Sequence, residues 1–334
     1  MSTITAGAVT PVSGAFATSP AYSGTFIPTL WSAKLNAKFY AASTFADVCN
    51  RDWEGEISGL GDKVVIPQIP DMSISDYVVG GNLTYDVPAM TPIELQIDRA
   101  KRFGFAVNDV LAHQAKLDLM DLFTNDASEQ MRARIDSTCI YNTFNQGAAA
   151  NRGATAGVKT GGYALGTDTG AIALSSSNVL QKILEMAAVL DEQNMPDTDR
   201  WLLIDPYTRT LLMQSSLAQA QYTGDDKSPV RNGLVGTIDR FKLYVTNQLP
   251  RNATGASTPW TSGDGTESSV TTSGAVDAKR VLIAGHRSAI TFASQIVKTE
   301  QLRNPTDFGD IVRGLQVFGF KVVKPEALTI CIVK

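Results

Sequence analysis

The sequence is poor in the residues that most often carry chemistry. Its 334 residues include two histidines, His113 and His286, and three cysteines that are far apart. Two histidines are too few for a histidine-rich zinc site, and an odd number of separated cysteines argues against a disulfide scaffold. We therefore expect Cys49, Cys139 and Cys331 to be small buried side chains of a protein from a reducing compartment.

Long apolar runs, a basic surplus and catalytic motifs are also missing. No apolar run approaches the ~20 residues of a membrane helix, and the first residues lack a signal-peptide pattern. A formal net charge of −4 argues against a reader of nucleic-acid sequence, which needs clustered Lys and Arg. No P-loop, dinucleotide-binding, zinc-protease or serine-hydrolase motif is present. These absences favour a structural protein, without enzyme activity, cofactor, metal or membrane partner.

Three groups of polar residues have a chemical interpretation, but a structural one explains each group better. His286 follows a predicted buried strand and could be a general base, yet no nucleophile motif lies near it. Asp205-Pro206 is explained by a helix start with an aspartate cap. Four acids lack the spacing of a calcium loop and are expected in a solvated turn: Asp47, Asp52, Glu54 and Glu56.

The clearest pattern is a long strand that alternates apolar and polar residues. Apolar side chains recur at every second position from Ile93 to Ile97, and the extended pattern continues through Phe103 and Phe105 to Val107. Fifteen residues at ~3.3 Å each would span about 50 Å, whereas an ordinary strand has about five or six residues. The pattern predicts a two-stranded arm over residues 61–107 that projects from the body and lies on a neighbouring subunit.

The rest of the chain predicts a mixture of helices and strands. The first 28 residues are uncharged and are expected to form a flexible arm. Apolar residues recur every three or four positions from Asp109 to Asn145, which predicts one long helix, and the charged residues, Asp136 among them, fall mostly off that stripe. Residues 147–170 are rich in Gly, Ala and Thr and predict a mobile loop.

The second half predicts an α/β core followed by terminal strands. A helix capped by Ser177 should end before Pro196, and a second helix should follow Asp205. Residues 252–274 are a Ser/Thr/Gly insertion. Strands are expected at 201–204, 241–245, 281–284, 318–322 and 328–332. The order of elements favours an α+β protein over a regular βαβ series.

Charge is distributed unevenly along the chain. Residues 51–98 contain nine acids and only two bases, Arg51 and Lys63, so the remainder of the chain is slightly basic. An acidic arm repels its own copies and is attracted to the body of the next subunit. We therefore predict ten residues at contacts between subunits: Asp62, Lys63, Asp76, Asp86, Arg99, Lys101, Arg102, Arg303, Asp310 and Arg313.

In its order of features the chain resembles major capsid proteins of tailed bacteriophages with the Hong Kong 97-like fold. The features are residues 50–56 leading to 61–64, the long hairpin, Trp201–Pro206 before a helix, and 296–322 with its Val312-Arg313-Gly314 step. The resemblance implies an N-terminal arm at 1–50 and an extended loop at 51–106. It further implies a peripheral domain with a spine helix, at 107–176 plus 290–334, and an axial domain at 177–289.

The resemblance also implies function and partners. Hexamers and pentamers of the chain would build an icosahedral shell around the double-stranded DNA of a virion assembled in the host cytoplasm. A separate scaffolding protein, a portal protein and a decoration protein are the expected protein partners. Two alternatives stay open, the shell of a bacterial nanocompartment with the same fold and an α/β enzyme built on residues 177–289.

Overall fold

A computed structural model describes residues 43–53, 63–70, 72–77, 79–80, 85, 87–108, 119–215, 237–252, 260, 262, 279–305 and 307–334. All of these residues belong to one compact unit. The predicted arm of residues 1–28, His113, and all but Asn252, Trp260 and Ser262 of the predicted insertion lie outside the described residues.

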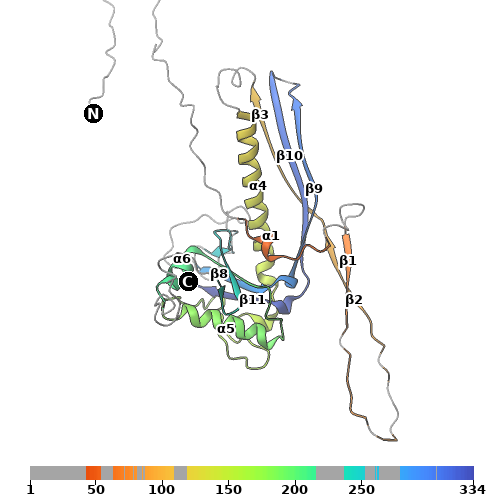
Figure 1. The fold of residues 1–334 in the computed structure, drawn as a ribbon, viewed down its shortest axis with the longest axis vertical. Helices are drawn as coiled ribbons and strands as arrows, with labels where there is room; N and C mark the ends of the chain where they lie inside the picture. The colour runs from red at the N-terminus through yellow and green to blue at the C-terminus, as the bar shows by residue number, and fades with distance from the viewer. Residues whose placement is uncertain are drawn as a thin grey trace, which may run out of the picture. The chain divides into compact units, whose positions relative to one another are not determined.

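A six-stranded sheet forms the centre of the unit (Figure 1). Its strand order is β11-β8-β4-β6-β5, with β7 beside β8. β4 and β6 run parallel, and the other pairs are antiparallel. The strands are β4 (Arg200–Ile204), β5 (Thr237–Ile238), β6 (Phe241–Val245), β7 (Arg251–Asn252), β8 (Lys279–His286) and β11 (Leu328–Val333). The predicted strands at 201–204, 241–245, 281–284 and 328–332 are therefore confirmed.

Both faces of this sheet are buried. Leu202 and Ile204 of β4 pack with the apolar side of α5 (Val179–Glu192) and with Leu212 of α6 (Pro206–Met213). The alternate residues Trp201 and Leu203 pack on the other face, in a second cluster that contains the end of α4 (Leu119–Thr143). Continuous apolar runs such as Trp201–Ile204 are typical of strands covered on both faces.

Local sequence signals explain how the helices and turns around the sheet begin and end. Asp205 caps α6, its carboxylate accepting a bond from the Thr208 N–H at 3.2 Å, and Pro206 occupies the first helical position, as predicted. Asp239 and Arg240 both have positive φ and form the two-residue turn between β5 and β6, a geometry that matches the twist of a hairpin. The predicted cap of α5 is wrong, because the cap position is Asn178 and not Ser177.

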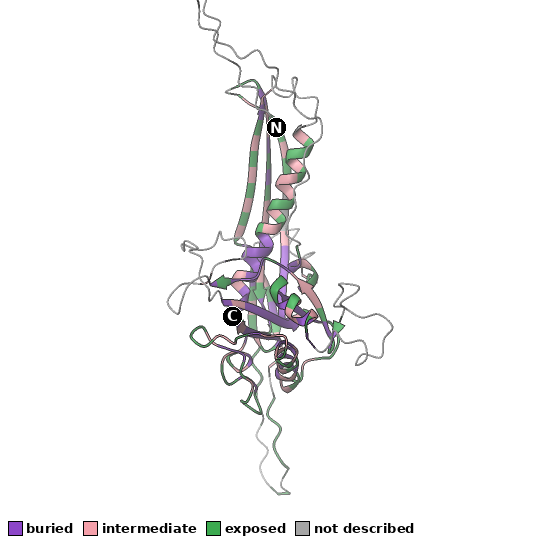
Figure 2. Cartoon of the chain, turned by 90° about the vertical axis from the view of Figure 1, so that its left-hand side faces the viewer, coloured by how far each residue is buried: buried purple, intermediate pink, exposed green. Residues whose placement is uncertain are grey.

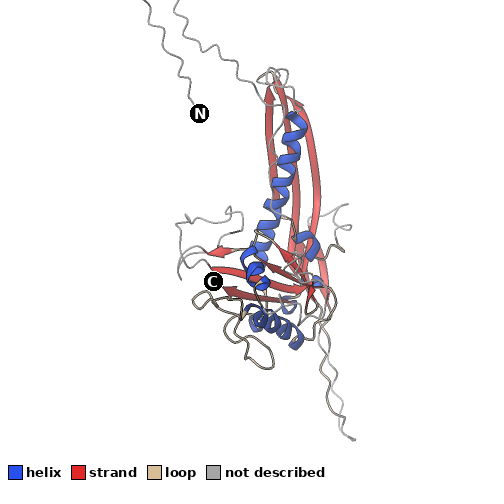
Figure 3. Cartoon of the chain, turned by 60° about the vertical axis from the view of Figure 1, so that its left-hand side comes forward, coloured by secondary structure: helices blue, strands red, loops and turns tan. Residues whose placement is uncertain are grey.

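A separate three-stranded antiparallel sheet, ordered β3-β10-β9, runs alongside the helix α4 and extends away from the six-stranded sheet (Figure 3). β9 (Ile290–Arg303) and β10 (Gly309–Val322) are long hairpin strands, and β3 (Arg99–Asn108) lies on the other side of β10. The helix α4 covers one face of this sheet, where Phe123 meets the Phe105 ring edge-on at 5.8 Å. The other face is uncovered in the described part of the chain.

The long helix is confirmed over Leu119–Thr143, and residues 109–118 lie outside the described residues. Its predicted apolar stripe is buried only in the second half, at Ile135 and Cys139, while Phe123 is exposed. Figure 2 shows the same change of burial along α4. The first half therefore faces a narrow sheet and leaves part of its stripe in solvent, which periodicity alone does not predict.

The predicted fifteen-residue return strand is broken in two. β2 (Thr91–Gln96) pairs with β1 (Lys63–Gln68), whereas β3 joins the three-stranded sheet. The break falls at Ile97 and Asp98, because Ile97 turns into a small cluster with Ile66, Leu95, Ala293 and Val323. A Cβ on Gly319 of β10 would lie 2.3 Å from the Gln96 carbonyl oxygen, so only glycine permits this close approach. The part that extends from the body is therefore the loop between β1 and β2.

Two further expectations need correction. The loop 147–170 is held by backbone bonds, such as Leu165 N–H to the Gly153 carbonyl at 2.8 Å, and it buries Ala156 and Leu165. The strand β11 pairs with β8, so residues 328–333 lie in the sheet of the predicted axial domain although the sequence division assigned them to the peripheral one. The remainder of that division stays a prediction.

Candidate assembly surfaces

The loop between β1 and β2 carries eight large apolar side chains that are exposed to solvent. Its large side chains are between 64% and 99% exposed, with Ile74 at the upper limit. They are Ile69, Met72, Ile74, Tyr77, Val79, Tyr85, Val87 and Met90. Monomeric proteins seldom present apolar side chains in such a continuous series. The loop is thus a candidate interaction surface, with exposed apolar side chains as well as acidic residues.

The uncovered face of the three-stranded sheet is the second candidate surface. In β3, Arg102, Gly104 and Ala106 point to this face, and Arg313 and Leu315 are their exposed neighbours on β10. Arg313 donates to the Glu300 carboxylate at 2.6 and 2.8 Å, and Lys298 bonds the same group. These two cations hold the pKa of Glu300 below its ordinary value. A groove lies over Gly104, between Arg102, Arg313 and Leu315.

Several residues predicted to contact neighbouring subunits already have partners within the chain. Lys63 donates to Glu94 across the β1–β2 hairpin at 3.2 Å. The Arg99 guanidinium lies over the Phe320 ring, 4.7 Å from its centre. Arg303 pairs with Asp310 at 3.3 Å near the β9–β10 turn. Lys101 also has an interaction partner.

The ten predicted contact residues are not gathered into one site. Lys63 is in the root of the loop and Asp76 in its exposed part, while the basic residues lie along the three-stranded sheet. Asp62 and Asp86 lie outside the described residues. Whether any of the ten contacts a neighbouring copy stays a prediction.

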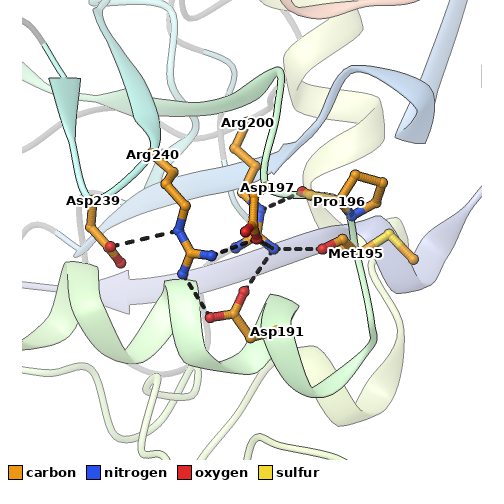
Figure 4. Close-up of polar contacts among 7 residues, drawn as sticks. All are labelled: Asp191, Met195, Pro196, Asp197, Arg200, Asp239 and Arg240. Atoms are coloured by element: carbon orange, nitrogen blue, oxygen red, sulfur yellow. Dashed lines mark hydrogen bonds and ion pairs between the residues drawn. The ribbon is translucent and has the colours of Figure 1, made fainter.

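A buried arginine at the start of β4 was missed by the sequence analysis (Figure 4). The Arg200 side chain is fully buried and donates to the backbone carbonyls of Met195 and Pro196, each at 2.7 Å. It also lies 2.7 Å from the Asp191 carboxylate, which in turn pairs with Arg240 at 2.9 Å. The network joins the α5–β4 loop to the β5–β6 turn, and it is structural. In the sequence, the only sign of this network is the presence of two aspartates, Asp191 and Asp197, shortly before Arg200.

Asp136 in the middle of α4 was also missed. Its carboxylate accepts bonds from the backbone N–H groups of Thr44 at 2.7 Å and Phe45 at 2.9 Å, and from the Ser43 hydroxyl at 3.1 Å. The pKa of Asp136 is raised because burial disfavours its charged form. The contact fixes the short helix α1 (Phe45–Val48) to the long helix. No sequence signal pointed to this contact, because Asp136 was expected to lie off the buried stripe of the helix.

His286 and the three cysteines, which could in principle carry chemistry, have surroundings that fit a structural role. His286 Nδ1 lies 2.8 Å from the Ser288 hydroxyl and accepts the Ser288 N–H, and burial lowers its pKa. All three cysteines are buried, as predicted, and burial raises the pKa of Cys331 to about 12. No group of three side chains suited to a metal occurs in the described ranges, and none of the helices described there is long and apolar enough to cross a membrane.

The chain aligns over most of its length with solved structures of phages, several of them described as capsids. The chain aligns with a structure of Mycobacterium phage Che8 at 23% identity and a TM-score of 0.69, covering 92% of this chain and 97% of that one. The capsid of cyanophage P-SCSP1u aligns at 17% identity and 0.67, covering 93% and 95%. The mature capsid of bacteriophage PhiM1 aligns at 11% and 0.61, covering 91% of each. A search of curated proteins finds no match. The fold is therefore the α+β, Hong Kong 97-like fold of shell subunits.

Residues 92–331 match the family described as phage capsid protein, which is most of the chain. The chain belongs to this family and is a major capsid protein, a structural subunit that associates with its own copies into the icosahedral shell of a tailed-phage virion. The predicted fold and function are confirmed.

Proposed function

We propose that each subunit holds its neighbour through the loop between β1 and β2, and that this contact drives shell assembly without a catalytic step. The observation that carries the proposal is the series of exposed apolar side chains from Ile69 to Met90. Burying one large apolar side chain is worth about 1.5–3 kcal/mol, so even partial burial of eight of them outweighs a few exposed ion pairs. The loop acids then set register and rate more than affinity.

In this proposal, the ten charged residues that the sequence predicts at subunit contacts lie at the contact between the loop and the neighbouring copy. The acids Asp62, Asp76 and Asp86 lie on or beside the loop, and the surface that receives them is the uncovered face of the β3-β10-β9 sheet. Its exposed cations include Arg102 and Arg313. Opposite charge on the two surfaces supports the pairing.

The proposal extends to partners and place. A separate scaffolding protein directs assembly in the host cytoplasm, a portal protein occupies one vertex, and double-stranded DNA fills the shell through non-specific contacts. A decoration protein is a further partner. The support for these partners is the family to which the chain belongs.

Deletion of the loop tests the proposal. Residues 72–88 are replaced by a short Gly-Ser linker, and the variant is compared with the wild type by light scattering and electron microscopy in the presence of scaffold. The described loop residues are exposed and outside the buried clusters, so we expect an unchanged melting temperature and no shells. Shells at the wild-type rate would refute the loop contact.

A further inference from the structure

Of the five arginines and lysines that the sequence predicts as partners of the loop on the body, four already have a partner within the chain. Arg303 is paired with Asp310, Arg313 with Glu300, and Arg99 with Phe320 and with Asn142. Lys101 also has a partner. Within the described part of the chain, Arg102 makes no hydrogen bond or ion pair. Its side chain is exposed on the uncovered face of the sheet, so it can meet an acid from outside without giving up an existing contact.

Beside Arg102 the face has a notch. Gly104 follows two residues later on the same face, and a Cβ built on it would find its nearest neighbours, the Val312 carbonyl and the Arg313 Cβ, at 3.8 and 3.9 Å. Gly314 differs, because its Cβ would lie 2.2 Å from the Phe103 ring. The glycine at 314 is required by packing within the subunit, whereas the glycine at 104 is not. The groove over Gly104 is lined by Leu315 and by charged side chains, Arg313 and Glu300 among them, so an apolar side chain from a partner would pack on Leu315 and on the aliphatic stem of Arg313.

The loop offers a matching pair of side chains. Ile74 is the most exposed apolar side chain described, and Asp76 follows two residues later. Like Arg102, Asp76 makes no hydrogen bond or ion pair among the described residues. In an extended chain, positions two apart lie on one side at a spacing of about 6.6 Å. Gly104 and Arg102 have the same spacing along β3, so the two pairs can meet simultaneously.

Building on the proposed function, we propose that Ile74 of one copy enters the notch over Gly104 of the next copy while Asp76 pairs with its Arg102. The loop then runs antiparallel to β3, since Ile74 precedes Asp76 and Gly104 follows Arg102. Ile74 packs on Leu315 and on the stem of Arg313, whose charged end remains with Glu300. The apolar contact supplies attraction and the ion pair supplies register.

A charge swap tests the ion pair. Asp76→Arg and Arg102→Asp are made singly and together, and assembly with scaffold is followed by light scattering at low and high salt. Each single change should slow assembly roughly tenfold at low salt, because it places like charges together. The double change should restore the rate to within about threefold of wild type. Reversal of the exposed Lys159, in Lys159→Asp, is the control and should have little effect.

A double variant no faster than the slower single variant would overturn the pairing. The loop deletion, measured in the same experiment, separates the two proposals. Shells formed by the deletion variant at the wild-type rate contradict the proposed function, whereas loss of shells in the deletion variant without rescue by the double variant contradicts only the Asp76–Arg102 contact.

A steric test addresses the notch. Gly104→Leu fills the space that Ile74 would occupy, and Gly104→Ala fills only part of it. Both should leave the melting temperature of the unassembled subunit nearly unchanged, and assembly should slow more for leucine than for alanine. Gly162→Ala is the matched control, since Gly162 is also exposed and its added Cβ would come no nearer than 3.9 Å to another atom. Wild-type assembly by folded Gly104→Leu would overturn the notch contact.

Discussion

The six-stranded sheet and the loop between β1 and β2 make opposite use of apolar side chains. Every residue of β4 is buried, and its alternate side chains enter two separate clusters. In the loop, Ile69 and Ile74 are almost fully exposed although their side chains are as apolar as those in the sheet. The sheet therefore stabilises the subunit itself, whereas the apolar surface of the loop contributes little to that stability and is available for the proposed contact with a neighbouring copy.

The largest expected effect comes from a cavity in the sheet. Phe241 of β6 is fully buried, and Phe241→Ala should lower the free energy of unfolding by about 3–5 kcal/mol. Tyr77→Ala in the loop should change it by less than about 0.5 kcal/mol. Chemical denaturation of unassembled subunits measures both. Similar losses in the two variants would mean that the loop packs on its own subunit in solution.

The next largest effect is expected at Arg200. Arg200→Ala removes a buried guanidinium from two carbonyls and two carboxylates, and we expect a loss of about 3 kcal/mol. Arg240→Ala, in the same network but partly exposed, should cost at most about 1 kcal/mol. Chemical denaturation measures both variants, and the midpoint of Arg200→Ala should be lower than that of Arg240→Ala while the slopes of the two transitions are equal. Equal midpoints for the two variants would contradict a structural role of the buried arginine.

An intermediate effect is expected where α4 is half-buried. Met131 packs against the main core cluster without being fully buried, so Met131→Asp should cost about 2 kcal/mol. Ser128→Asp, on the partly exposed side, should cost under about 1 kcal/mol, including loss of the Ser128 hydroxyl bond to the Thr124 carbonyl. Thermal unfolding distinguishes them. A reversed order would contradict the register of the helix.

The smallest effect concerns Asp136 and depends on pH. Asp136→Asn keeps the shape but weakens the acceptor of three donors, with an expected cost of about 1–2 kcal/mol at neutral pH. Burial raises the folded-state pKa of Asp136 above its unfolded value, so the folded wild type binds the proton more tightly. Its stability relative to the asparagine variant should therefore increase as pH falls from the folded-state pKa toward the unfolded one. If the difference in free energy of unfolding between the wild type and Asp136→Asn became smaller as the pH falls through this range, the raised pKa of Asp136 would be contradicted.

The contrast between sheet and loop also explains how far the sequence predicts the fold. Apolar runs and alternation identified four strands of the six-stranded sheet, and periodicity identified the long helix, because burial on a regular element leaves a regular pattern. The strands β5 and β7 were not predicted, since each has only two residues. The same alternation runs without interruption through Ile97, yet the strand breaks there. An apolar residue at position 97 fits both a continuous strand and a broken one. The partners that Ile97 packs against, Ala293 and Val323, are distant in the sequence, so the local pattern does not reveal the break.

Polar residues in the interior were the least predictable part. The position of Asp136 off the apolar stripe gave no sign of burial, but the backbone of residues 44 and 45, some ninety positions earlier, brings two N–H groups to it. Arg200 is buried because the loop before it turns two carbonyls inward. Of the candidate assembly site, the sequence predicted the loop and its charges, but not which cations are already paired.

The close contact of Gly319 with Gln96 has a mechanical consequence. Since the two backbones touch without an intervening side chain, the root of the loop cannot slide along β10. Beyond the root, the described residues of 69–90 have no strand pairing, so a change in the direction of the loop would break no strand hydrogen bond there.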